Sequence, residues 1–171
     1  MDGTLAAIFF IAGLTDMALN DCPTGCLQLE SNDARLFLQA SGVEFDREII
    51  GEELGIGYAF ARSYGPFQPI VMATMTDQER FWVGAGALWT KPIVANSPIF
   101  VEASFMPGYD SGGAGPDIGG NLQFRSSLGL GYTFDGGATL ALAYDHRSNA
   151  DRLALNPGLE TISLKLSILL D

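Results

Sequence analysis

Basic residues and histidine are scarce in this chain of 171 residues. Nine lysines and arginines stand against 20 aspartates and glutamates, so the formal net charge is −11. Binding to nucleic acid calls for clustered Lys and Arg side chains that neutralise phosphates. We therefore expect no nucleic-acid partner. The length suits one domain rather than two.

Cysteine is almost absent as well, with only Cys22 and Cys26 in the segment CPTGC. A structural zinc site usually needs four Cys or His ligands, and the single histidine, His146, lies far along the chain. We predict no metal and no cofactor. The two cysteines form either a local disulfide or a pair of free thiols near the N-terminus of the mature protein.

No apolar run reaches the roughly 18 to 20 residues that a membrane-spanning helix needs. The longest, LAAIFFIAGL, has the length of the apolar region of a secretory signal, although an acidic residue and no basic residue precede it. A buried helix or strand is the alternative. We predict a targeting segment at residues 1–21 with cleavage between Ala18 and Cys22, an N-terminal leader at 22–33 and a barrel at 34–171.

What the chain has in abundance is a two-residue alternation. In NLQFRSSLGLGYTF, residues 121–134, most even positions are large and apolar, whereas odd positions such as Gln123, Arg125 and Gly129 are polar or very small. Alternate residues of a strand point to opposite faces of a sheet. Similar segments recur, weaker ones lie near 34–44 and 67–77, and glycine-rich turns separate several of them. The pattern predicts eight strands.

The two faces of these strands decide between a soluble and a membrane barrel. A soluble eight-stranded barrel of the lipocalin type would expose many charged residues, but only 17% of this chain is charged and 47% is hydrophobic. The face of small residues, with isolated charges such as Glu53, Glu102 and Arg125, suits the interior of a narrow barrel. We predict an all-β fold, an eight-stranded antiparallel transmembrane β-barrel of the outer-membrane type, which is too narrow to act as a pore.

Three chemically active side chains fall on the apolar face of the last two strands. His146 and Ser148 continue the apolar positions of one strand, and Glu160 begins those of the next. A hairpin centred near residue 153 places Glu160 opposite His146. A hydroxyl, an imidazole and a carboxylate together form a relay for nucleophilic catalysis. The alternative is ordinary polar residues where strand ends meet headgroups and water.

The same stretch, HRSNADRLALNPGLE, resembles the C-terminal signature of the PagL-type lipid A 3-O-deacylases, also called acyloxyacyl hydrolases. The family pattern is His, any residue, Ser, Asn, then Asn a few residues before Glu, which His146, Ser148, Asn149, Asn156 and Glu160 match. The resemblance implies a barrel in the bacterial outer membrane that removes the acyl chain ester-linked at position 3 of lipid A. It also implies Ser148 as nucleophile, His146 as general base and Glu160 as the partner that orients His146.

Neighbouring residues receive supporting roles in this interpretation. Asn149 and Asn156 are candidates for the oxyanion hole or for substrate positioning, although Asn156 also fits a simple turn in NPG. Arg147 and Arg152 are candidates for contacts with lipid A phosphates, with loop solubility as the alternative.

The partners expected on this reading are lipid A or lipopolysaccharide and outer-membrane lipids, and a homodimer is left open. Two other functions are also left open. One is a non-catalytic structural or adhesive barrel, and the other is an outer-membrane phospholipase.

Overall fold

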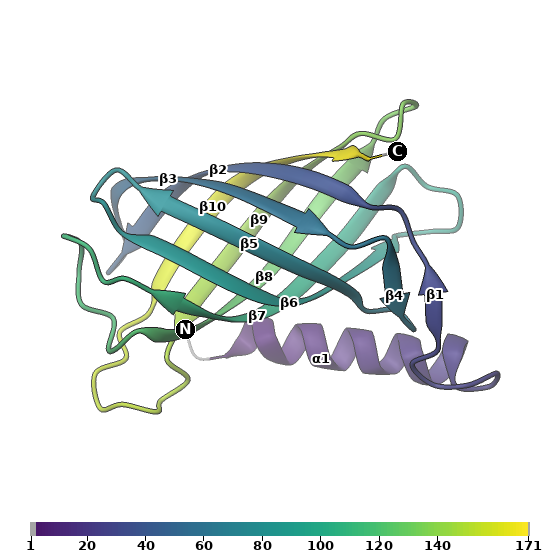
Figure 1. Cartoon of the computed structure of the whole chain (residues 1–171), viewed down its shortest axis with the longest axis horizontal. Helices are drawn as coiled ribbons and strands as arrows, with labels where there is room; N and C mark the ends of the chain where they lie inside the picture. Colours follow the sequence, from purple (N-terminus) through teal and green to yellow (C-terminus); the bar gives the residue numbers. More distant parts are fainter. Residues whose placement is uncertain (1–2, 171) are drawn as a thin grey trace.

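The computed structural model describes residues 3–170, and Figure 1 shows a barrel with one helix lying along its side. Within this part of the chain, eight strands close into an antiparallel barrel in the order β10-β2-β3-β5-β6-β7-β8-β9, and β1 pairs with β4 in a separate small sheet. The predicted barrel is therefore confirmed. The elements are α1 (Thr4–Asp16), the π-helical turn η1 (Met17–Asp21), β1 (Leu29–Ser31), β2 (Arg35–Phe45), β3 (Glu48–Ala59), β4 (Arg62–Tyr64), β5 (Gln68–Thr76), β6 (Phe81–Pro92), β7 (Ile99–Asp110), β8 (Leu122–Thr133), β9 (Thr139–Ser148) and β10 (Leu159–Leu169).

The two faces of the strands lie as the alternation predicts. On β8, Gln123 and Arg125 are fully buried in the lumen, whereas Leu130 on the other parity is 57% exposed on the outer wall. The outer wall carries a belt of exposed aliphatic side chains, which a lipid bilayer would cover. Members of this belt include Leu38, Leu54, Ile56, Val83, Leu130, Leu142, Ile162 and Leu164.

Small residues on the inner face make room for a few large side chains. Trp82 of β6 is fully buried in the lumen. A Cβ atom at Gly84 would lie 2.3 Å from its ring, and one at Gly108 would lie 2.5 Å from it. Since real Cβ atoms do not approach so closely, the glycines on this face allow Trp82 to fill the narrow interior.

Paired charges occupy the part of the lumen next to Trp82. Glu53 of β3 accepts hydrogen bonds from Arg125 Nη1 at 3.0 Å and from Arg147 Nη2 at 2.7 Å. Arg125 Nε also donates to Asp145 at 3.1 Å, and Arg147 Nη1 donates to Asp110 at 3.3 Å. All five side chains are almost completely buried. Buried charges persist when they are paired in this way, and the network ties several strands together across the lumen.

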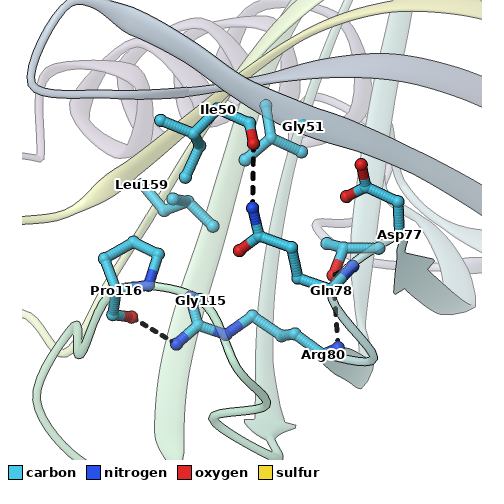
Figure 2. Close-up of a pocket in the computed structure, with 10 residues that line it drawn as sticks. Ile50, Gly51, Asp77, Gln78, Arg80, Gly115, Pro116 and Leu159 are labelled. Carbon is cyan, nitrogen blue, oxygen red and sulfur yellow. Dashed lines mark hydrogen bonds between the residues drawn. The ribbon is translucent and has the colours of Figure 1, made fainter.

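The loops at the end of the barrel next to the β9–β10 connection are bound to one another. Figure 2 shows Gln78 donating to the carbonyl of Ile50 at 2.8 Å and Arg80 donating to the carbonyl of Pro116 at 2.5 Å. The hollow that these loops surround measures about 10 Å³. That is scarcely enough for one water molecule, so this hollow is not a substrate site.

Helix α1 packs against the outer wall over β7 and β8. Phe9, only 3% exposed, lies with its ring centroid 6.3 Å from that of Phe105 in a stacked arrangement. At the C-terminal end of the helix, Asp16 accepts hydrogen bonds from Trp89 Nε1 at 2.9 Å and from Lys91 Nζ at 2.6 Å. The helix is thus held against the barrel at its middle and at its C-terminal end.

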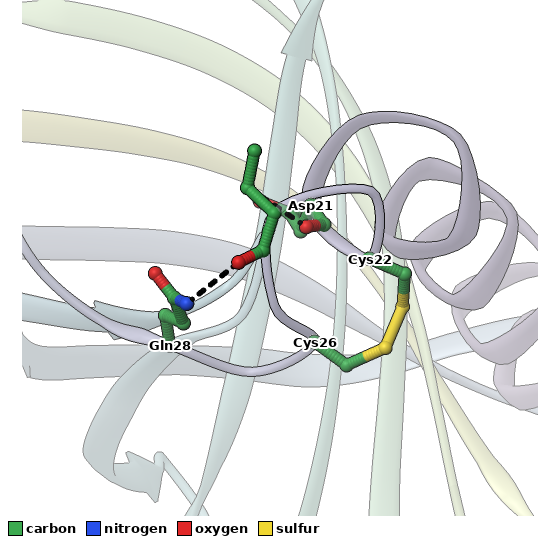
Figure 3. The surroundings of a disulfide bond; sticks show 5 residues. Asp21, Cys22, Cys26 and Gln28 are labelled. Carbon is green, nitrogen blue, oxygen red and sulfur yellow. Dashed lines mark hydrogen bonds between the residues drawn. A yellow bond between two sulfur atoms is a disulfide. The ribbon is translucent and has the colours of Figure 1, made fainter.

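The apolar run LAAIFFIAGL lies within a longer helical stretch, Thr4–Asp21, whose length and mean hydropathy would allow it to cross a membrane although it also contains polar residues. This helix fits the predicted signal-like segment. After it, Cys22 and Cys26 are joined by a disulfide (Figure 3). Of the two alternatives for these cysteines, the structure therefore has the disulfide. Disulfides form in oxidising compartments such as the bacterial periplasm.

Candidate active site

Strands β9 and β10 bring His146 and Glu160 together on the outer wall. The two residues are direct partners in the antiparallel register, and His146 Nδ1 lies 3.0 Å from Glu160 Oε1. The hairpin predicted from the sequence places Glu160 opposite His146 in this way. A carboxylate on Nδ1 selects the tautomer of the imidazole and leaves Nε2 to act on a substrate or nucleophile.

His146 and Ser148 line one cavity of about 300 Å³ on the outside of the barrel. This volume is within the usual range for ligand pockets. Although both residues have outward parity, His146 is only 5% exposed and Ser148 only 9%. Side chains of β7 and β8, the β9–β10 loop and the N-terminal end of α1 form the rest of the wall, which accounts for this burial. The cavity is lined by Gly3, Ala6, Phe105, Phe124, Ser126, His146, Ser148, Ala150, Asp151, Asn156 and Pro157.

Ser126 is a second hydroxyl in this cavity, and the sequence reasoning missed it. It is the direct partner of His146 on the β8 side and is 3% exposed. Its outward parity on residues 121–134 was visible in the sequence, but its position beside His146 depends on the pairing register of two strands. Any test of Ser148 therefore needs Ser126 as its control.

Two asparagines shape the loop beside Ser148. The backbone N–H of Asn149 donates to Asn156 Oδ1 at 2.9 Å. The side-chain amide of Asn149 donates to the carbonyls of Gly119 at 2.9 Å and Leu155 at 2.7 Å, and Asn156 Nδ2 donates to Asp151 Oδ1 at 2.8 Å. The structure thus places both side chains in contacts that hold the loop in its conformation.

The chain turns sharply directly after Ser148. Ala150 and Asp151 both line the cavity, and both have a positive φ, 56° and 57°. The N–H of Arg152 donates to the carbonyl of Asn149 at 3.3 Å, which closes a tight turn over these two residues. No group of three or more His, Cys, Asp or Glu side chains among residues 3–170 is arranged to hold a metal ion.

The structure separates the two arginines that were predicted to contact lipid A phosphates. Arg152 is exposed in the β9–β10 loop. Arg147 is only 2% exposed and points into the lumen, where it pairs with Glu53 and Asp110. The prediction of a phosphate contact for Arg147 is therefore wrong. Its position between His146 and Ser148 gives it the opposite parity, so the alternation already indicated an inward side chain.

Gly158 supports His146 from the loop that leads into β10. Its φ is +80°, and a Cβ atom there would lie 2.7 Å from His146 Cε1. A glycine at this position is required both by the backbone conformation and by the close approach of the imidazole ring. The segment NPG is a turn signal in the sequence, but nothing in the sequence places His146 against it.

We predict that Gly158→Ala lowers kcat by about 10- to 100-fold, because the new methyl group displaces the imidazole by a fraction of an ångström. The measurement is steady-state hydrolysis of a lipid ester by refolded protein. Gly136→Ala is the control, since a Cβ atom there meets no heavy atom within 4 Å. Equal activities of the two variants would show that the position of the ring does not depend on Gly158.

Comparison with known proteins gives the family. A family model described as Lipid A 3-O-deacylase (PagL) matches residues 71–168, more than half of the chain and the whole of the site on β9 and β10. The chain belongs to the PagL family. It is therefore an ester hydrolase of a family of lipid A 3-O-deacylases, built on an outer-membrane β-barrel. The predicted family, enzyme class and outer-membrane localisation are confirmed.

Solved structures show the same fold. The crystal structure of the outer membrane enzyme PagL superposes with a TM-score of 0.64 at 18% identity, covering 78% of this chain and 98% of PagL. Neisserial surface protein A superposes with a TM-score of 0.54 at 11% identity, covering 84% of this chain and 99% of that one. A de novo designed transmembrane β-barrel gives 0.59 at 8% identity, covering 82% and 98%. A comparison with curated proteins found no match.

Proposed function

We propose that this PagL-family barrel hydrolyses the 3-O-linked acyl ester of lipid A with Ser148 as nucleophile, His146 as general base and Glu160 as the residue that orients His146. The observation that carries the proposal is the 3.0 Å contact between His146 Nδ1 and Glu160 Oε1. It lies on the lipid-facing wall, where the same histidine lines a cavity with Ser148. A paired imidazole and carboxylate at this position need a reason, because polar groups facing lipid are costly.

The proposed reaction uses these three side chains in turn. His146 Nε2 takes the proton of the Ser148 hydroxyl while Ser148 Oγ bonds to the ester carbonyl carbon. The N–H groups of Ala150 and Asp151 stabilise the negative charge on the carbonyl oxygen. The bond to the sugar oxygen then breaks, and His146 protonates that oxygen. In a second step His146 takes a proton from water while the water oxygen bonds to the acyl carbon. The bond to Ser148 Oγ then breaks, His146 returns the proton to that oxygen, and the fatty acid leaves.

The direction of the barrel in the membrane fits a substrate in the outer leaflet. We propose that the short turns between β6 and β7 and between β8 and β9 face the periplasm and that the β9–β10 loop faces the cell surface, as is usual for outer-membrane barrels. Lipid A would then reach Ser148 by lateral diffusion. Arg152, exposed in this loop, is proposed to contact a lipid A phosphate.

The test is mass spectrometry of lipid A after incubation with the refolded protein. Loss of one 3-hydroxyacyl group with the parent chain and with Ser126→Ala, but not with Ser148→Ala, would support the proposal. Hydrolysis of a glycerophospholipid in place of lipid A would identify a phospholipase. Hydrolysis of neither ester by the refolded protein would contradict the proposal.

We also propose that residues 1–21 are a targeting segment, that 22–33 is a leader and that 34–171 forms the enzyme. Gly3 and Ala6 form part of the wall of the cavity that holds Ser148, so removal of the segment opens the cavity to lipid.

We predict that a chain starting at residue 22 has a kcat/KM on lipid A at least about tenfold higher than the full chain, because the helix no longer competes with the substrate. Steady-state rates of the two refolded proteins, compared at equal folded concentration, check this. Equal rates would contradict it.

A further inference from the structure

Strand β9 alternates residues of the proposed site with charged residues of the lumen. His146 and Ser148 lie on the outer wall, and Arg147, between them, points inward. The peptide groups on either side of Arg147 therefore belong to the chain segment that positions both the nucleophile and the base. Whatever holds Arg147 also limits the movement of those two residues.

Arg147 is held by strands that are not neighbours of β9. Its Nη2 donates to Glu53 of β3 at 2.7 Å, and its Nη1 donates to Asp110 at the end of β7 at 3.3 Å. Its guanidinium carbon lies 5.4 Å from the ring centroid of Trp82 of β6. In the barrel, β9 pairs only with β8 and β10, so these contacts cross the lumen. Two carboxylates on different strands and an aromatic face fix the planar guanidinium in direction as well as in position.

The pairing of β9 with β10 ends just before the proposed nucleophile, Ser148. Arg147 is the last residue of β9 that pairs with β10, opposite Leu159. Ser148 pairs only with Phe124 of β8, and a ten-residue connection, 149–158, follows. A strand end that is paired on one side and leads into a loop opens easily. The side-chain contacts of Arg147 come immediately before this point.

We propose that Arg147 is a positioning residue for the deacylation reaction. It anchors the end of β9 from inside the barrel and so holds Ser148 in place beside His146. This inference rests on the proposed function. It replaces the phosphate contact expected of Arg147 from the sequence. An ion pair that served only the stability of the barrel would affect how much protein folds, but not the reactivity of Ser148 in the folded fraction.

The experiment compares Arg147→Met with Lys165→Met. Lys165 of β10 pairs with Glu102 of β7 inside the same barrel, so its replacement breaks an interior ion pair away from the end of β9. Two quantities are measured on the folded fraction of each protein: the steady-state constants for lipid A, and the rate at which a small fluorophosphonate reagent labels Ser148. The reagent reports on the serine and its base without requiring lipid A to bind.

We expect Arg147→Met to lower kcat and the labelling rate together by about 100-fold, as a displacement near 1 Å would, with KM changed by less than about threefold. Lys165→Met should leave the labelling rate within about threefold of the parent. If Arg147→Met does not fold, Arg147→Lys is scored in its place. Lysine keeps a charge for Glu53 but lacks the rigid fork that reaches Asp110 at the same time, so its labelling rate should fall about tenfold.

The outcomes separate this inference from the proposed function. Equal labelling rates for the parent, the Arg147 variant and Lys165→Met would overturn the positioning role while Ser148 stayed the nucleophile. A fall in labelling that is equally large in Lys165→Met would overturn it too, because any interior ion pair would then have the same effect. Absence of labelling at Ser148 in the parent chain would mean that the proposed function itself has failed.

Discussion

Replacing Ser148 by alanine is expected to lower kcat for lipid A deacylation by about 10⁶-fold, and replacing His146 by asparagine is expected to have nearly the same effect. The two groups act as one unit, since the serine hydroxyl is a weak nucleophile until the imidazole takes its proton. In serine hydrolases the loss of either group costs about as much as the loss of both. We therefore expect the double variant to retain the same residual activity as each single variant.

The measurement is single-turnover and steady-state hydrolysis of lipid A, followed by mass spectrometry, at equal concentrations of folded barrel. Ser126→Ala is the matched control, because Ser126 lines the same cavity and is the register partner of His146. A large loss of activity in Ser126→Ala, with activity kept in Ser148→Ala, would identify Ser126 of β8 as the nucleophile. Losses that multiply in the double variant would show that Ser148 and His146 do not act together.

Replacing Glu160 by glutamine is expected to lower kcat by about 10⁴-fold, the effect of an amide in place of the orienting carboxylate in a serine triad. The 3.0 Å contact with His146 Nδ1 remains geometrically possible after this change. An amide, however, does not stabilise the imidazolium that forms as Ser148 attacks, and it can present its NH₂ group to Nδ1 and so select the wrong tautomer. KM should change little, because Glu160 interacts with His146 rather than with the acyl chain.

Glu44→Gln provides the control for Glu160→Gln. Glu44 is the partner of Glu160 on the β2 side of β10, so the same chemical change is made on the next strand of the outer wall. We expect its kcat to lie within about threefold of the parent. Comparable losses in the two variants would mean that the general negative charge of this wall, rather than the orientation of His146, determines the rate.

The alternation seen along residues 121–134, and its recurrence in the other segments, was enough to predict both the barrel and its two faces. Gln123 and Arg125 had to point into a lumen, because a lipid-facing charge is costly and apolar residues surrounded them in the sequence. The same alternation places Arg147, which stands between His146 and Ser148, on the inner face.

The sequence by itself determined the period of the strands, the lipid-facing set of side chains, the family signature and the pairing of His146 with Glu160, since each depends only on local spacing and on one hairpin. Only the tertiary structure decided what surrounds these groups. Ser126 and Gly158 reach His146 through the pairing register and the loop conformation, and Arg147 meets Glu53 and Asp110 across the lumen. The Arg147 contacts join strands that are far apart in the chain, and they exist only when closure of the barrel brings those strands to opposite walls of one narrow interior.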